Sequence, residues 1–388
     1  MLEAGAAQVD ITPALSEKVV RLAGYRARNK APARGVLDRL HVRALFLRQG
    51  SDNLIIVSCD QLWISHRIKE LVLEAISPPY QVVSRELLIC ATHTHSGPAG
   101  LTDHPLAVEL FGPYDTELWE ITCHNLIAAI NLAARSLRPA SLAITAAPWE
   151  GYTINRRHPA KPIDPQITLL KIEDNQSHLI ALVTNFTAHP TILGPDNLLL
   201  SADFPGYFTQ ELQRLIGGDP VIIFCNGTQG DQAVRQDVLI GEDAYARCSY
   251  FGKALAQRVY SMTYEAQTGP LNKLSSFLLE QHLPPATNKL MSFTHAPLQG
   301  FIIDNALFLA VPGEVIAALG LQIKQEAQRQ GYWPVAIIGL ANGYIGYILT
   351  EEEYHRGGYE PSVSFYGPKL GQSIEKGLLE VIKALASL

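Results

Sequence analysis

The chain has 388 residues, of which 47% are hydrophobic and 18% charged, the composition of a globular protein that can bury a large core. Lysine and arginine number 31 against 37 acidic residues, so the net charge is −6, and the lack of a long basic run argues against a nucleic-acid partner. No stretch approaches the roughly 18 consecutive apolar residues of a transmembrane helix.

The start of the chain and its cysteines predict a cytoplasmic location. The first ten residues lack the basic segment and apolar run of a signal peptide. The five cysteines are widely spaced, odd in number and mostly within apolar runs, which indicates buried free thiols. No low-complexity linker divides the sequence, so we expect a single catalytic domain over residues 1–388 and leave the oligomeric state open.

A pattern of apolar strand, polar loop, amphipathic helix and second apolar strand recurs along the chain. In the first unit, residues 53–58 are apolar and lead to Asp60. Residues 66–76 have helical spacing, and residues 86–91 form a second strand that ends near His93. This unit predicts two parallel strands joined by a helix.

Two further segments separate the first unit from the second. Residues 116–136 have strong helical spacing and are expected to pack on the sheet. Residues 152–163 form a basic, proline-containing loop.

The second unit repeats the pattern. Residues 178–185 are apolar and lead to His189, and residues 204–216 are expected to be helical. Residues 220–225 are the second strand, and the polar loop that follows them contains Asp231.

The third unit completes the series. Residues 306–311 lead to Glu314, residues 315–330 have helical spacing, and residues 335–340 form the second strand. The tail, residues 367–388, is helical by its pattern.

This alternation predicts an α/β fold with mixed, largely parallel sheets flanked by helices. The polar clusters lie beyond the carboxyl ends of the strands, where open α/β sheets bind their ligands. We therefore expect His93, His189 and Glu314 to converge, although they are far apart in the sequence.

The Thr-His-Thr-His segment is the first candidate for a metal site. His93 and His95 are two residues apart, so in extended backbone both rings point to one face. One of the rings can instead cap a loop by hydrogen bonding. His189 and Glu314 have similar structural alternatives, a satisfied strand-end histidine and a turn into a helix, but two histidines and a carboxylate from three units are a plausible catalytic zinc set.

Carboxylates can orient the histidine ligands of a metal, and Asp60 and Asp231 are the candidates for that role. For Asp231 the alternative is a tight turn. The signatures of other chemistries, GxSxG, the P-loop motif and a GxGxxG after a strand, are missing from the sequence.

Six motifs, in this order along the chain, resemble those of the neutral (non-lysosomal) ceramidases. They are Ala4-Gly5-Ala6-Ala7 with Val9-Asp10-Ile11-Thr12-Pro13, Thr92-His93-Thr94-His95-Ser96-Gly97-Pro98, Ala188-His189-Pro190, Asn226-Gly227 through Gly230-Asp231, Pro312-Gly313-Glu314, and Gly339-Leu340-Ala341-Asn342 with Tyr344 and Tyr347. The resemblance runs from about Glu3 to beyond Pro368.

The resemblance implies a single zinc ion and a set of residues around it. The implied ligands are His93, His189, Glu314 and Tyr347, of which the tyrosine is an uncommon zinc ligand. On the substrate side it implies His95, near the scissile amide, together with Arg156 of the Ile-Asn-Arg segment and Tyr359. Such groups can transfer a proton or stabilise an oxyanion, and the alternative for Arg156 is a solvated loop arginine.

The sequence departs from the family pattern at one position of direct chemical importance. Where the family has the serine proposed as nucleophile, in Gly-Asp-Val-Ser-Pro, this chain has Ala233. The family's secretory signal and its C-terminal immunoglobulin-like domain are not found in the sequence either. Zinc can generate a nucleophile from water, so we expect a zinc-dependent hydrolase of an amide or ester.

Two alternatives remain at this point, a ceramidase that releases fatty acid from N-acylsphingosine and a non-catalytic member of the family that binds a structural metal. The basic segment 156–161 predicts a polar or anionic substrate in preference to a membrane lipid.

Overall fold

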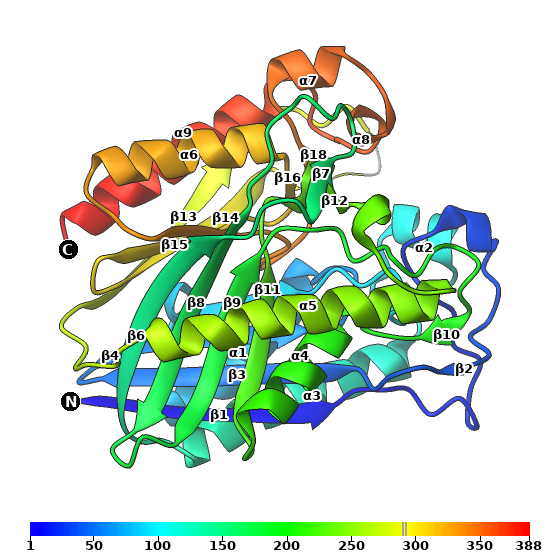
Figure 1. Cartoon of the computed structure of the whole chain (residues 1–388). Helices are drawn as coiled ribbons and strands as arrows, with labels where there is room; N and C mark the ends of the chain where they lie inside the picture. Colours follow the sequence, from blue (N-terminus) through cyan, green and yellow to red (C-terminus); the bar gives the residue numbers. More distant parts are fainter. Residues whose placement is uncertain (289–290, 292) are drawn as a thin grey trace.

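The computed structural model describes residues 1–288, 291 and 293–388. The chain forms an eight-stranded sheet in the order β11-β9-β8-β6-β1-β3-β4-β5 and a four-stranded sheet in the order β13-β14-β15-β17 (Figure 1). The strands of the large sheet are β1 (Leu2–Asp10), β3 (His41–Gln49), β4 (Asp52–Cys59), β5 (Leu87–Ala91), β6 (Arg138–Pro148), β8 (Gln166–Asp174), β9 (Leu179–Phe186) and β11 (Val221–Asn226). Those of the small sheet are β13 (Leu274–His282), β14 (His295–Ile303), β15 (Ala306–Ala310) and β17 (Val335–Ile338).

The large sheet bends at its centre. Strands β1 and β6 pair through two residue pairs only, Glu3 with Pro139 and Ala4 with Arg138, so the two halves are joined weakly there. The outer edges of the two halves lie close together: the sulfur atoms of Cys90 on β5 and Cys225 on β11 are 3.7 Å apart. Both halves and the small sheet contribute to one buried apolar cluster, so three sheet faces enclose a common core.

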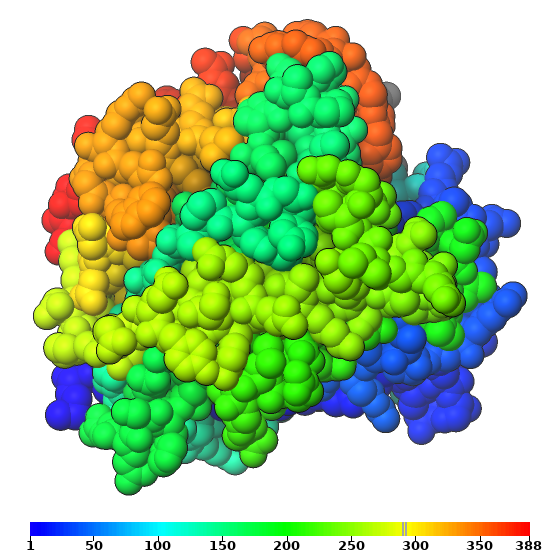
Figure 2. Space-filling model, in the orientation of Figure 1, coloured from blue at the N-terminus to red at the C-terminus, as the bar shows by residue number. Residues whose placement is uncertain are grey.

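Helices cover the outer faces of these sheets (Figure 1). Their bounds are α1 (His66–Tyr80), α3 (Thr116–Arg135), α4 (Phe204–Ile216), α5 (Ala244–Glu265), α6 (Ala317–Arg329) and α9 (Leu370–Ala386). Helices α1 and α3 pack on β3 and β4, α4 and α5 pack on β8, β9 and β11, and α6 and α9 pack on the small sheet. In Figure 2 the side chains of α5 form a continuous yellow-green band across this face of the molecule.

The three predicted strand-helix-strand units are present. Strands β4 and β5, joined through α1, pair in parallel, as do β9 and β11 through α4 and β15 and β17 through α6. The helix expected over residues 116–136 is α3, and the C-terminal helix is α9. The α/β class and the flanking helices are therefore confirmed.

The prediction of largely parallel sheets is wrong. Within the large sheet the two edge pairs are parallel, and the pairs between them, from β9/β8 to β3/β4, are antiparallel. The antiparallel strands β1, β3, β6 and β8 lie outside the strand-helix-strand units, so a prediction built from those units alone overestimated parallel pairing. In the described part of the chain, no helix has the length and apolar character needed to cross a bilayer.

The remaining elements are short and lie in the loops at the strand ends. They are β2 (Gly35–Val36), β7 (Thr153–Asn155), β10 (Leu199–Leu200), β12 (Gln232–Val234), β16 (Glu314–Val315), β18 (Tyr347–Ile348), α2 (Pro105–Phe111), α7 (Glu351–His355), α8 (Tyr359–Ser362) and the 3-10 turns Arg26–Arg28, Ser84–Glu86, Gln229–Asp231 and Gln236–Val238.

Candidate metal centre and substrate pocket

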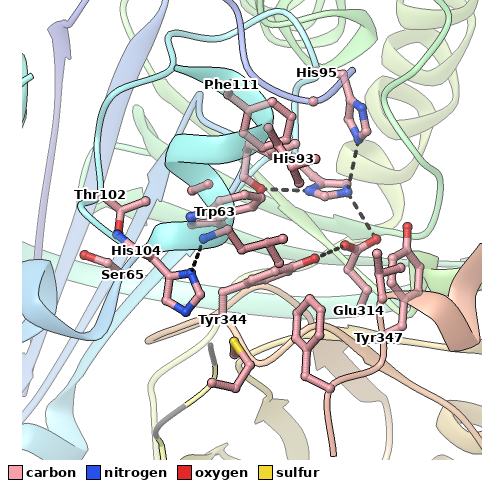
Figure 3. Close-up of a pocket in the computed structure, with 18 of the residues that line it drawn as sticks. Trp63, Ser65, His93, His95, Thr102, His104, Phe111, Glu314, Tyr344 and Tyr347 are labelled. Atoms are coloured by element: carbon pink, nitrogen blue, oxygen red, sulfur yellow. Dashed lines mark hydrogen bonds and ion pairs between the residues drawn. The ribbon is translucent and has the colours of Figure 1, made fainter. Parts of the chain in front are cut away.

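The residues implied as metal ligands meet at the carboxyl ends of the strands. His93 follows β5, His189 follows β9, and Glu314 follows β15, so each predicted unit contributes one of them. Strands β16 and β18 pair in parallel with Glu314 opposite Tyr347, which brings the tyrosine to the same place. Figure 3 shows His93, Glu314 and Tyr347 turned toward one another.

The polar atoms of this cluster are very close. Oε2 of Glu314 is 3.2 Å from Nε2 of His93 and 3.1 Å from Nε2 of His189. The two Nε2 atoms are 3.3 Å apart, and Oη of Tyr347 is 3.3 Å from Nε2 of His189. All four side chains are 3% exposed or less, so water from the bulk does not screen them.

Backbone carbonyls fix the orientation of the two histidines. Nδ1 of His93 is 2.7 Å from the carbonyl oxygen of Leu62, and Nδ1 of His189 is 2.6 Å from that of Gln229. When such a ring is neutral, its Nδ1 donates the proton to the carbonyl and its Nε2 carries the lone pair. Burial, together with the charge of Arg156, lowers the pKa of His189 to about 4, so this ring is neutral near pH 7.

A cation fits among these atoms. Two imidazole lone pairs and a carboxylate repel one another at such distances unless a positive charge lies between them. Oε2 of Glu314 is buried and has no hydrogen-bond partner among the described residues. Nitrogen and carboxylate oxygen donors in this number suit zinc, and other divalent metals also accept them.

His95 differs from the other two histidines. Its Nε2 lies 3.3 Å from Nε2 of His93, so the three histidines form one group that could hold a metal. However, Nδ1 of His95 is buried without a hydrogen-bond partner in the described chain, and its ring packs against Tyr25 at 4.8 Å. Since no carbonyl fixes its tautomer, either nitrogen of His95 can carry a proton. Burial holds the pKa of His95 well below its ordinary value.

Two further residues hold Glu314 and Tyr347. The hydroxyl of Tyr344 donates a 2.7 Å hydrogen bond to Oε1 of Glu314, which leaves Oε2 for the centre of the cluster. Nη2 of Arg156 donates to Oη of Tyr347 at 2.8 Å and to the carbonyl oxygen of Gly230 at 3.0 Å. The sequence interpretation missed the role of Tyr344, because Tyr-x-x-Tyr alone does not show which hydroxyl faces the carboxylate.

Asp60 and Asp231, which were expected to orient the histidines, form hydrogen bonds to other groups. Oδ2 of Asp60 accepts hydrogen bonds from the backbone of His41 and from Arg43, both at 2.8 Å. Oδ1 and Oδ2 of Asp231 accept from Ala317 N and Asn155 Nδ2, both at 2.7 Å. These carboxylates stabilise strands and a helix start, while carbonyls of the loops beside them orient the histidines.

Arg156 and Tyr359 both lie beside Tyr347. Nε of Arg156 donates to Glu360 at 3.0 Å, so the arginine is anchored and is not a solvated loop residue. The ring of Tyr359 is 5.9 Å from that of Tyr347, and its side chain lines a pocket that leads to the histidines. At 61% exposure it is placed at the mouth of the site.

The pocket beside the cluster is a cavity of about 110 Å³ with mostly apolar walls. Trp63 and Tyr344 stack at 4.6 Å on one side, and Phe111 at the end of α2 packs against Trp63 at 5.8 Å (Figure 3). Further apolar wall residues are Leu62, Leu106, Leu110, Met291, Phe293, Val363 and Phe365. An apolar group of a ligand is the natural occupant of such walls.

The expectation of a polar or anionic substrate is not supported by this geometry. Arg157 of the basic segment pairs with Glu353 at 2.9 Å and with Glu360 at 2.6 Å, and Lys161 pairs with Glu353 at 3.1 Å. The segment is neutralised within the molecule, because α7 and α8 supply a carboxylate for each of these cations.

Ala233 lies next to the candidate metal centre. It is on β12, opposite Ile154 of β7, and forms a parallel bridge with His189. The backbone N–H of His189 donates to the carbonyl oxygen of Gln232 at 2.9 Å. The position of the missing serine is therefore beside a candidate ligand.

Known proteins resemble this chain in sequence and in fold. Residues 2–250 match the family described as neutral/alkaline non-lysosomal ceramidase, N-terminal. Neutral ceramidase B of Dictyostelium discoideum is 28% identical over 232 residues, which cover 55% of this chain and 32% of that protein. The neutral ceramidase of Mycobacterium tuberculosis is 22% identical, and the alignment covers 95% of this chain and 74% of that protein.

The crystal structure of neutral ceramidase from Pseudomonas aeruginosa superposes with a TM-score of 0.85 over 100% of this chain and 74% of that chain. At 20% identity this comparison shows a shared fold. The family match extends over more than half of the sequence. The chain therefore belongs to the neutral/alkaline non-lysosomal ceramidase family, a family of hydrolases.

Proposed function

We propose that the protein is a metal-dependent amidohydrolase that cleaves the amide bond of an N-acylated lipid by attack of water. The observation that carries the proposal is the buried set of His93, His189, Glu314 and Tyr347, with the unpartnered Oε2 of Glu314 at its centre, at the inner end of an apolar pocket. The apolar walls would take the acyl chain, in agreement with the names of the family and of its relatives.

A divalent ion, for which zinc is the first candidate, would act as a Lewis acid and bring the pKa of a water down toward about 7. His95 would take a proton from the attacking water and deliver it to the leaving nitrogen, since its tautomer is not fixed by a carbonyl. Tyr359, which lines the pocket, would donate its hydroxyl proton as a hydrogen bond to the oxyanion.

Arg156 acts mainly on Tyr347 in this proposal. Its guanidinium is held by Glu360 and the carbonyl of Gly230, and it directs Nη2 at the tyrosine oxygen. A cation at 2.8 Å favours the ionised form of the phenol, which is the form that binds a metal.

Elemental analysis and a hydrolysis assay test the proposal together. Purified protein should hold one equivalent of zinc or a related metal, and His93→Ala and Glu314→Ala should lose it. The metal-loaded chain should release fatty acid from an N-acylsphingosine, and His95→Ala should retain metal but lose most of the turnover. Stoichiometric metal without hydrolysis of any N-acyl amide would favour a non-catalytic member of the family instead.

A further inference from the structure

A second pocket of about 410 Å³ adjoins the apolar one. It lies between α1 and the place where β13 ends and β14 begins. The side chains of His66 and Phe293 line both pockets, and their rings contact each other at 4.6 Å. The second pocket therefore shares a wall with the substrate pocket but contains none of the candidate catalytic residues.

Lys69 in this pocket is a buried cation without a partner. The residue is 6% exposed, and its Nζ has no hydrogen-bond partner among the residues that the structure describes. By contrast, Lys324, which is also strongly buried, forms a 2.6 Å ion pair with Asp164. Buried charges in folded proteins are normally paired, so Lys69 is the exception that needs an explanation.

The position of Lys69 on α1 adds to the excess of positive charge. It is the fourth residue of the helix, and the first turn contains no acidic residue. The amino end of a helix itself carries a partial positive charge, which disfavours a cation and favours an anion there.

The neighbouring carboxylates do not remove this excess. Glu70 and Glu280 line the same pocket, but both are exposed at its rim. Glu280 acts on the lysine at a distance, and burial, which is the larger effect, lowers the pKa of Lys69 to about 8. The lysine is therefore still mainly charged at pH 7. Nε2 of His66, which also faces this region, is buried without a partner in the described chain.

We propose that Lys69 is the cation of an anion-binding subsite that takes a carboxylate or a phosphate group. An anion entering from the open side would pair with Nζ and gain from the amino end of α1. It could be a free ion, or it could be an acidic group at the far end of a substrate that extends past His66 and Phe293, since these two side chains line both pockets.

Binding of simple anions to the full chain tests the subsite without any need for hydrolysis. Lysine amines would be reductively labelled with ¹³C-methyl groups, and the Lys69 signal followed by NMR while phosphate, acetate or glutarate is added. We expect a saturable shift of that signal in the wild type and no saturable binding, by calorimetry, in Lys69→Met. Lys253→Met, which removes an exposed lysine of α5, is the matched control and should bind as the wild type does.

The melting temperature of Lys69→Met shows whether this variant folds. Replacing an unpaired buried charge by a methionine of similar length should raise the melting temperature in the absence of anions. Equal anion binding by wild type and Lys69→Met, or a Lys69 signal that no anion shifts, would overturn the proposal.

A pair of matched amide substrates distinguishes the two sources of the anion. A wild-type preference for a distal carboxylate over a distal methyl group, lost in Lys69→Met, would assign the subsite to the substrate. Saturable phosphate binding with no such preference would assign it to a free ion. Because the NMR and calorimetric readouts do not depend on turnover, the subsite and the proposed hydrolysis can fail separately.

Discussion

Tyr347 is the member of the candidate ligand set whose residue type is least common among zinc ligands. Its hydroxyl lies 3.3 Å from Nε2 of His189 and accepts a hydrogen bond from Arg156 at 2.8 Å. In this setting the phenol oxygen can complete a ligand set that contains two histidines and one carboxylate. The positive charge of Arg156 favours the phenolate form, whereas burial and Glu314 oppose it and hold the pKa of the Tyr347 phenol well above its ordinary value.

Tyr347→Phe keeps the ring and removes the oxygen. We expect metal affinity to fall by more than the roughly 10- to 100-fold that the loss of a hydrogen-bond partner of a ligand typically costs. Competition with a chromogenic chelator measures this change. Tyr344→Phe is the matched control, because it removes the hydrogen bond to Oε1 of Glu314 but leaves Oε2 in place. A larger loss in Tyr344→Phe than in Tyr347→Phe would contradict the assignment of the tyrosines.

Ala233 tests whether water is the nucleophile. The residue is bridged to His189, so Ala233→Ser restores a hydroxyl beside the site. If water attacks, this variant should hydrolyse an N-acyl amide at a rate close to that of the wild type and form no covalent adduct. Mass spectrometry of the protein quenched during turnover detects such an adduct. An acyl-serine adduct together with a clear gain in rate would instead mean that the wild-type chain has lost a serine nucleophile that the family uses.

Asp38 makes stability depend on pH. Its carboxylate accepts hydrogen bonds from Ser201 and from the backbone of Ala202, and burial raises its pKa from 3.8 to about 7. Since the folded value lies above the unfolded one, the contribution of this group is complete below about pH 4 and is lost as pH rises through 7. The unfolding free energy of the wild type minus that of Asp38→Asn should therefore fall by at most about 4 kcal/mol as the pH rises from about 4 to about 7. Urea unfolding at several pH values measures it, and a difference that grows with pH would be the contrary result.

At the scale of secondary structure, α9 supports the strand that carries Tyr347. Gly371, near the start of α9, approaches the backbone so closely that an added Cβ would lie 2.0 Å from the carbonyl oxygen of Leu349. Leu349 directly follows β18 (Tyr347–Ile348). Because Gly371 has no side chain, α9 can pack against Leu349 beside the site.

Gly371→Ala should push α9 away from this strand. Overpacking of this kind costs about 1–3 kcal/mol of unfolding free energy, and we expect metal affinity to fall as well because β18 shifts. Gly269→Ala is a suitable control, since no atom lies within 4 Å of its added Cβ. Chemical unfolding and a metal titration of both variants check this, and equal stability of the two would argue against the close contact.

The whole molecule is organised around the meeting point of its sheets. Each half of the large sheet contributes one histidine, and the small sheet contributes Glu314. Hydrogen bonds already join these parts, among them those from Ser58 Oγ to the carbonyl oxygen of Phe224 and from Asn185 Nδ2 to that of Ile337. A metal bound among the four side chains would add a further link.

Removal of the metal should consequently lower the melting temperature. A ligand present at about 100 times its dissociation constant stabilises the folded state by about 2.7 kcal/mol, which corresponds to several degrees for a chain of this size. Calorimetry with and without a chelator measures the shift, and addition of zinc should reverse it. His93→Ala should melt at the lower temperature and no longer respond to the chelator. An unchanged melting temperature of the wild type after chelation would speak against a metal that links the sheets.

Much of this organisation was predictable from local patterns in the sequence. Apolar runs with periods of two and 3.6 residues located the strand-helix-strand units, and residues 204–216 form α4 with the predicted bounds. The polar residues that follow strands indicated His93, His189 and Glu314, because strand ends collect ligands in α/β folds. The resemblance to the ceramidases added Tyr347, and the cytoplasmic location stays a prediction.

The tertiary structure decided what depends on contacts between distant residues. The antiparallel strands between the units, the carbonyls of Leu62 and Gln229 that orient the histidines, and the hydroxyl of Tyr344 on Glu314 have no local sequence signature. The basic segment at residues 156–161 looked free in the sequence, yet its charges are paired by glutamates about 200 positions away. Residue types and their spacing determined which groups reach the strand ends, whereas the packing of three sheets determined which of their atoms face one another.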